Sequence, residues 1–178
     1  MLKYLAIVVA AATLNTQAAF AQSQPHAAFK DRPIKALSPD EIANLRAGRG
    51  MGMALPAELN RYPGPMHVLE NDAALELSPE QREALRRQVD AMRAEAISLG
   101  EQVIALETVL DSLFKSGAVD AEMIDQTTAT VAALYGKLRA VHLRTHLATR
   151  ATLTETQLVK YETLRGYDTK GSSPAHKH

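Results

Sequence analysis

The chain has 178 residues, the size of one domain with an appended arm. Its 20 Lys and Arg balance 20 Asp and Glu, so it lacks the basic excess of a general nucleic-acid binder. Cys is absent, which excludes disulfides, Cys-based zinc sites, iron–sulfur clusters and Cys nucleophiles. Ala and Leu, both strong helix formers, dominate the apolar residues and favour an all-α fold.

Residues 1–21 have the pattern of a secretory signal peptide. Lys3 provides the positive start, Leu5–Leu14 is a short apolar run, and Ala19-Phe20-Ala21 fits the small-x-small cleavage rule. The run is shorter than the ~20 residues that span a bilayer, and no later stretch is apolar enough to span one. We therefore expect cleavage after Ala21 and, in a bacterium, a periplasmic protein; the alternative is an uncleaved anchor. The periplasm lacks ATP and the chain lacks a Gly-rich phosphate loop, so an ATP-driven mechanism is disfavoured.

Residues 22–65 are predicted to form an N-terminal arm with one short helix, over about 38–47. Ser38 suits the N-cap, Pro39 the first helical position, and Glu41 completes a capping box. From Gly48 onward the arm is rich in Gly and Pro, which predicts a loop. A second short helix is expected over 66–75.

The pentapeptide Leu77-Ser78-Pro79-Glu80-Gln81 has the same helix-start pattern and predicts a long helix over 79–115. Apolar residues then recur at alternating spacings of four and three. This is a heptad seam, typical of helices that pack at a small crossing angle. The seam residues are Leu85, Val89, Met92, Ala96, Leu99, Val103, Leu106, Leu110 and Leu113.

Ser116-Gly117-Ala118 is predicted to end this helix, and a second long helix is expected to begin near Asp120. So short a connection makes the two helices antiparallel neighbours. Leu153-Thr154-Glu155-Thr156-Gln157 is a third helix start, for a last helix that ends near Arg165. Residues 66–167 thus form a helical-hairpin domain, and 168–178 are expected to be a disordered polar tail. Because the apolar seams are narrow, the short helices or a second copy of the chain must cover them, and we expect a homodimer.

The two pentapeptides that flank the hairpin share the form Leu-[Ser/Thr]-x-x-Gln. In a chain with a signal peptide and no Cys, this arrangement resembles the Spy/CpxP family of periplasmic helical-hairpin proteins. The resemblance implies a cradle-shaped dimer. It also implies a range of roles: ATP-independent chaperone, inhibitor of an envelope-stress sensor kinase, periplasmic metal sensor or zinc-binding resistance protein. The motif residues themselves are expected to cap their helices; they are Leu77, Ser78, Gln81, Leu153, Thr154 and Gln157.

His142 and His146 are four residues apart on the second long helix, so both imidazoles lie on one face and can bind one metal ion. The intervening residues lack the Glu of a zinc protease. A hairpin turn near Gly117 brings Met92 and Asp90 to the same level as further ligands, and His67 is another candidate. A carboxylate suits Zn²⁺, Ni²⁺ or Cu²⁺, whereas Met favours Cu⁺. The alternative is that both histidines are ordinary residues beside the seam.

Other features of the sequence bear on metal and partner binding. Met51 and Met53 lie beside Gly residues of the arm, and the tail histidines His176 and His178 can bind metal loosely. The hairpin turn is acidic, whereas the later part of the second helix carries only basic charges. These form a candidate surface for acidic partners or unfolded clients, or else a solvated helix face. The basic residues are Lys137, Arg139, Arg144 and Arg150.

The chain contains neither a nucleophile-elbow motif nor a carboxylate pair forced together by spacing, so we expect a protein that is not an enzyme. No cofactor is required, and the one candidate for a bound cofactor is a transition-metal ion, Zn, Cu or Ni. The first hypothesis is a periplasmic ATP-independent chaperone or envelope-stress modulator that acts as a homodimer on unfolded envelope proteins or on a sensor kinase. The alternatives are a heavy-metal sensor or resistance protein that uses His142 and His146, and a coiled-coil adaptor.

Overall fold

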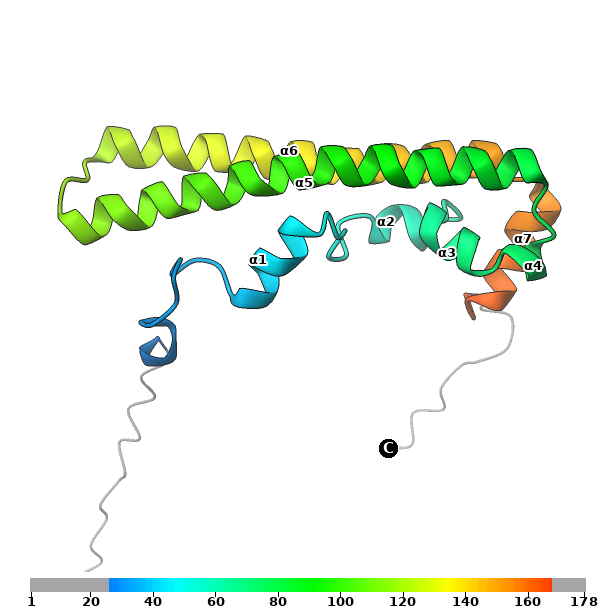
Figure 1. Cartoon of the computed structure of the whole chain (residues 1–178), viewed down its shortest axis with the longest axis horizontal. Helices are drawn as coiled ribbons and strands as arrows, with labels where there is room; N and C mark the ends of the chain where they lie inside the picture. The colour runs from blue at the N-terminus through cyan, green and yellow to red at the C-terminus, as the bar shows by residue number, and fades with distance from the viewer. Residues whose placement is uncertain (1–25, 168–178) are drawn as a thin grey trace, which may run out of the picture. The chain divides into compact units, whose positions relative to one another are not determined.

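The computed structural model describes residues 26–167 (Figure 1). The predicted signal peptide 1–21 and the tail histidines His176 and His178 lie outside the described residues. The chain divides into two units, and the first extends to Lys30. Its described part holds one turn of 3-10 helix, η1 (Ala27–Phe29), in which the Phe29 N–H donates to the His26 carbonyl at 3.0 Å. The second unit holds all the α-helices described below.

The second unit is helical and has no strand among its described residues, which confirms the all-α prediction. The helices are α1 (Pro39–Arg46), α2 (Leu55–Glu58), α3 (Pro65–Glu70), α4 (Asp72–Leu75), α5 (Pro79–Ser116), α6 (Ala121–Thr152) and α7 (Glu155–Leu164). None of the helices in this part of the chain is long and apolar enough to cross a membrane.

Two short segments differ from the sequence prediction. The region expected to be a plain loop contains α2, which begins at Leu55 with Pro56 in its first turn. The helix expected over 66–75 is divided into α3 and α4 at Asn71. The Asn71 side chain donates to the His67 carbonyl at 2.7 Å, and such side-chain bonds to the backbone compete with helical hydrogen bonding.

The long helices α5 and α6 run side by side as an antiparallel hairpin (Figure 1). Gly117 ends α5 in the left-handed conformation at φ 71°, and Asp120 caps α6 by accepting the Met123 N–H at 2.8 Å. Thr149 donates to the Gln88 side chain at 3.1 Å. This pairing agrees with the register predicted from a turn near Gly117.

The apolar core has two parts. In the first, α1 packs on the middle of the hairpin, where Leu45 contacts a cluster that includes Leu99 and Leu138. The second lies at the end of the hairpin opposite the turn, near α4 and α7 (Figure 1), and is built around Leu85 and Tyr161. The short helices therefore cover part of the hairpin, as expected for narrow seams.

Burial of the α5 seam decreases toward the turn. Leu85, Ala96, Leu99 and Val103 are buried. In contrast, the last seam residues Leu106, Leu110 and Leu113 are only partly buried. The part of the hairpin nearest the turn thus has apolar surface that the described residues leave partly uncovered.

Candidate functional site

The cavity that holds the predicted histidine pair lies between α6 and the arm. It has a volume of about 350 Å³. Four of the candidate ligands named from the sequence line it together: His142, His146, His67 and Met92. Its other lining residues come from the arm and α5; they are Ala47, Gly48, Arg49, Gly50, Gly64, Pro65, Met66 and Arg93. An adjoining cavity of about 280 Å³ shares the three histidines and Gly50, and adds Met51 and Glu58.

Two glycines of the arm let the backbone approach the histidines closely. A Cβ on Gly50 would lie 3.4 Å from His142 Nδ1, and a Cβ on Gly64 would lie 3.1 Å from His146 Nε2. A larger residue at Gly64 would therefore press on the His146 ring, whereas a Cβ at Gly50 would be in ordinary van der Waals contact with His142. The arm covers the histidine pair because glycine leaves room for it.

His142 is buried, with 4% of its surface exposed. Its Nε2 atom is buried and has no hydrogen-bond partner among the described residues. Burial in this setting lowers the pKa of His142, and the neighbouring His146 lowers it further. The ring is therefore neutral near pH 7 and keeps a lone pair on one nitrogen, which a metal ion can use.

His146 is held by the arm backbone. Its Nδ1 atom lies 2.7 Å from the Tyr62 carbonyl oxygen. A carbonyl oxygen only accepts hydrogen bonds, so Nδ1 carries the proton and the lone pair of the neutral ring is on Nε2. A hydrogen bond of this kind from the second ring nitrogen is the usual way in which proteins orient a metal-binding histidine.

Glu58 is a buried carboxylate behind the histidines, with 7% of its surface exposed. One oxygen accepts the Gly64 N–H at 2.9 Å, and the other accepts the Tyr161 hydroxyl at 2.5 Å. Tyr167 also donates to it, at 3.2 Å. Burial raises the pKa of Tyr161, and the hydrogen bond to Glu58 raises it further. Through these hydrogen bonds, the Glu58 carboxylate holds α2 and the arm against α7.

Glu58 and Tyr161 were not predicted from the sequence. They are far apart in the chain, and no local spacing pattern links a Glu in a four-residue helix to a Tyr near the C-terminus. Only the folded arrangement brings them together.

Met51 is at the rim of the adjoining cavity in a strained backbone conformation. Its φ is 44°, in the left-handed region that residues other than Gly seldom adopt. Such strain persists only where the surrounding structure imposes it, and it is common at functional sites. Met53, by contrast, packs against the first core cluster.

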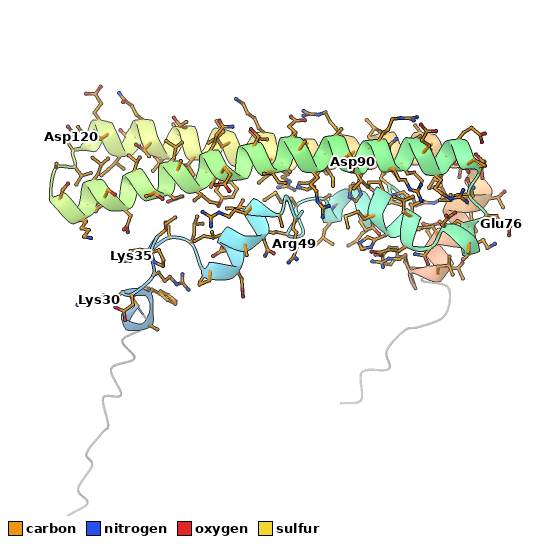
Figure 2. All side chains as sticks on the ribbon, viewed as in Figure 1. Lys30, Lys35, Arg49, Glu76, Asp90 and Asp120 are labelled. Atoms are coloured by element: carbon orange, nitrogen blue, oxygen red, sulfur yellow. The ribbon has the colours of Figure 1, made fainter. Side chains whose placement is uncertain are left out.

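Asp90 does not join the other predicted ligands. It is exposed on α5 and is absent from the residues that line the two cavities. Figure 2 labels it on α5, and labels Arg49 in the loop that follows α1. His67 lines both cavities, but its Nδ1 atom lies 3.0 Å from Glu70, which leaves its other ring nitrogen for a ligand.

Nitrogen and oxygen donors alone do not form a complete metal site here. Within residues 26–167, no group of three or more His, Asp or Glu side chains is arranged to hold a metal ion. The further donors on these cavity walls are the thioethers of Met51, Met66 and Met92.

The motif residues cap their helices as predicted. Ser78 and Gln81 form a capping box at the start of α5, and Thr154 and Gln157 form one at the start of α7. The two glutamines also hydrogen bond to each other, at 2.9 and 3.0 Å. The paired motifs therefore join the beginnings of two helices, a role that capping alone does not indicate.

The four basic residues of α6 have different surroundings. Arg150 pairs with Glu155 at 2.9 Å and lies over the Tyr62 ring. Arg144 pairs with Glu95 at 3.4 Å, while Lys137 and Arg139 are exposed. Arg150 therefore contributes to the packing of the arm on α6.

None of the protein-family models, curated proteins or solved structures with which the chain was compared matches it. What the cavity does must therefore follow from its own residues.

Proposed function

We propose that this protein binds a transition-metal ion reversibly through His142 and His146, and acts in the periplasm as a heavy-metal sensor or a metal-binding resistance protein. One observation carries the proposal: His142 is buried beside His146, yet its Nε2 atom has no partner among the described residues. Leaving a buried polar atom unpaired costs about 1–3 kcal/mol, and metal binding at this ring would offset that cost. The resemblance to the Spy/CpxP family, which includes metal sensors, also supports it.

The two rings suit this role in different ways. His146 is oriented by the Tyr62 carbonyl, and its remaining nitrogen lies beside Gly64 in the cavity wall. His142 is kept neutral by burial. Metal ions bind only neutral imidazole, so His142 does not need to lose a proton when an ion enters.

Metal titration of the full chain tests the proposal. His176→Gln and His178→Gln are introduced first, because tail histidines bind metal independently. Calorimetry with Zn²⁺, Ni²⁺, Cu²⁺ and Cu⁺ should then show one ion per chain for at least one metal. Losing an outer-shell partner of a metal ligand typically weakens metal binding by about tenfold or more. Because His142→Gln and His146→Gln each remove a ligand itself, each should weaken binding by at least that factor.

His26→Gln is the matched control. His26 belongs to the first unit and is not a lining residue of either cavity, so its loss should leave the affinity unchanged. Equal affinity in the parent chain and the His142→Gln variant, or no binding of any of the four ions, would overturn the proposal.

The second candidate function is an ATP-independent chaperone or envelope-stress modulator. Apolar side chains near the hairpin turn favour it: Val109 is 48% exposed, Phe114 58% and Met123 41%. Val109 also lines a shallow hollow with Leu113. Exposed apolar groups of this kind can contact partly unfolded chains, and the exposed Lys137 and Arg139 would attract acidic segments of a client or of a sensor kinase.

An aggregation assay separates the two functions. A chaperone should suppress aggregation of a heat-treated client without ATP, and Val109→Ser with Phe114→Ser should abolish this effect. His142→Gln should leave the suppression intact, because His142 is buried away from these side chains. No effect of the parent chain on the aggregation curve would remove the chaperone candidate.

A further inference from the structure

The donor atoms in the histidine cavities indicate which kind of metal ion they accept, and this inference rests on the metal-binding function proposed above. Met66 and Met92 line the larger cavity with the three histidines, and Met51 lines the adjoining one. Thioether sulfur is a soft donor, which favours soft ions over hard or borderline ones. Imidazole binds both soft and borderline ions, so the thioether sulfurs determine which kind of ion the cavities favour.

Carboxylates are scarce at the same place. Glu58 is the one acidic residue in the lining of either cavity, and both of its oxygens already accept hydrogen bonds, from Gly64 and Tyr161. Divalent borderline ions in proteins are usually held by four nitrogen, oxygen or thiolate ligands. The described residues lack even a group of three His, Asp or Glu side chains suited to this.

The charges on the wall also act against a divalent ion. The larger cavity is lined by two basic residues besides its histidines, Arg49 and Arg93, and by no acidic residue. Coulomb repulsion from these groups is twice as large for a divalent ion as for a monovalent ion at the same place. A monovalent soft ion suffers less repulsion and gains more from the sulfurs.

We propose that the cavity between the arm and α6 selects Cu⁺ through the imidazoles of His142 and His146 together with the thioethers of Met66 and Met92. Met51, at the rim of the adjoining cavity, is placed to take part when the ion enters or leaves. No carboxylate ligand is needed, because a monovalent soft ion binds well to few, neutral donors.

An anion is the competing ligand, since guanidinium and imidazolium groups both attract anions. Arg49 already donates to Asn44 at 3.1 Å, and the Nδ1 atom of His146 already donates to the Tyr62 carbonyl at 2.7 Å. Donors that an anion would need are therefore engaged within the protein.

The test compares Cu⁺ and Zn²⁺ binding in methionine variants of the full chain that carries His176→Gln and His178→Gln. Cu⁺ affinity is measured without oxygen by competition with a bicinchoninate chelator, and Ag⁺ calorimetry provides a redox-inert check. Met66→Leu and Met92→Leu keep the side-chain volume but remove sulfur. Each should weaken Cu⁺ and Ag⁺ binding by about tenfold or more, at least the cost of losing an outer-shell partner, and leave any Zn²⁺ affinity unchanged.

Met123→Leu is the matched control, because Met123 is exposed at the other end of α6. It should leave all affinities unchanged. Copper X-ray absorption of the loaded parent chain should show sulfur neighbours, and these should diminish in the Met66→Leu, Met92→Leu double variant. Circular dichroism should be the same for all variants.

The outcomes separate this inference from the proposed function. Tight Zn²⁺ or Ni²⁺ binding that needs His142 and His146, with Cu⁺ affinity unaffected by the methionine variants, overturns the Cu⁺ inference but leaves the metal-binding function standing. Binding of phosphate or sulfate with no metal binding overturns both. Cu⁺ binding that both the histidine and the methionine variants weaken supports both.

Discussion

At the scale of single residues, His142 links the candidate site to the stability of the protein. Its ring is buried and its pKa is lowered, chiefly by burial. Below the ordinary histidine pKa of 6.5, the unfolded chain takes up a proton on this residue while the native chain does not. The native state therefore loses stability as the pH falls from 6.5 toward the lower native pKa.

His142→Gln should make the free energy of unfolding less dependent on pH. Between pH 7.5 and 5.5, the free energy of unfolding of the parent chain should fall more than that of the variant, by up to about 1.4 kcal/mol per pH unit. Urea unfolding with a metal chelator present measures this difference. The exposed His26→Gln variant should match the parent chain, and an unchanged slope in His142→Gln would contradict the prediction.

The Tyr161 hydroxyl should contribute measurably to stability because it donates to the buried carboxylate of Glu58. Tyr161→Phe keeps the ring packing but removes a charge-assisted hydrogen bond, which is worth about 1.5–3 kcal/mol. Chemical denaturation measures the loss. Tyr135→Phe is the control, since the partly buried Tyr135 hydroxyl makes no hydrogen bond within residues 26–167. If Tyr161→Phe and Tyr135→Phe lower the free energy of unfolding equally, the hydrogen bond from Tyr161 to Glu58 contributes nothing to stability.

At the scale of helices, α1 approaches α5 so closely that it needs a glycine. A Cβ on Gly100 would lie 2.5 Å from the Leu45 carbonyl oxygen, which belongs to the α1 backbone and cannot swing aside. The sequence shows only that Gly100 lowers helix propensity. The structure gives the reason for its presence, which is the packing of one helix on another.

Gly100→Ala should therefore destabilise the protein by about 1–3 kcal/mol through overpacking, although Ala favours helices. Gly136→Ala is a matched control in α6, because a Cβ there meets nothing within 4 Å. It should stabilise the protein by about 0.5–1 kcal/mol. Thermal denaturation of both variants gives the comparison, and a stabilising Gly100→Ala would mean that α1 does not pack there.

In double-mutant cycles, the cap residues of the two motifs should behave differently from the glutamines of the two motifs. Ser78→Ala and Thr154→Ala each remove one cap, worth about 1 kcal/mol, and their effects should add. Gln81→Ala and Gln157→Ala remove two side chains that hydrogen bond to each other, so their effects should deviate from additivity by about 0.5–3 kcal/mol. Additive glutamine effects in urea unfolding would show that the contact between the motifs contributes nothing.

At the scale of the whole molecule, the partly exposed end of the hairpin bears on oligomeric state. Leu106, Leu110 and Leu113 continue the seam but are only partly buried, and Phe114 is exposed beside them. A second copy of the chain would cover this surface in place of an unfolded client, as the narrow seams predict, so the dimer and the chaperone candidate compete for the same side chains.

We expect sedimentation to show a dimer at micromolar concentration. Leu113→Glu should shift it to a monomer, because a charge would be buried in the interface. Leu164→Glu is the control: Leu164 is exposed on α7, at the opposite end of the hairpin. A stable monomeric parent chain would remove the dimer prediction.

The sequence alone determined the helices that begin with strong local signals. Ser38, Ser78 and Thr154 cap α1, α5 and α7 as predicted, because a capping box depends only on residues three apart in the chain. The length of the hairpin and its register followed from heptad spacing and a glycine turn, which are also local features. The histidine pair and Met92 were predicted because helical spacing and that register place these residues at one level, whereas His67 was a candidate that neither spacing nor register placed.

The tertiary structure alone decided the rest, because it depends on contacts between residues far apart in the chain. It divided the predicted helix at Asn71, added α2, and left Asp90 outside the cavities. It also joined Gln81 to Gln157 and Glu58 to Tyr161. A periodic pattern shows which face of a helix is apolar, but the element that packs on that face follows only from how the whole chain fits together.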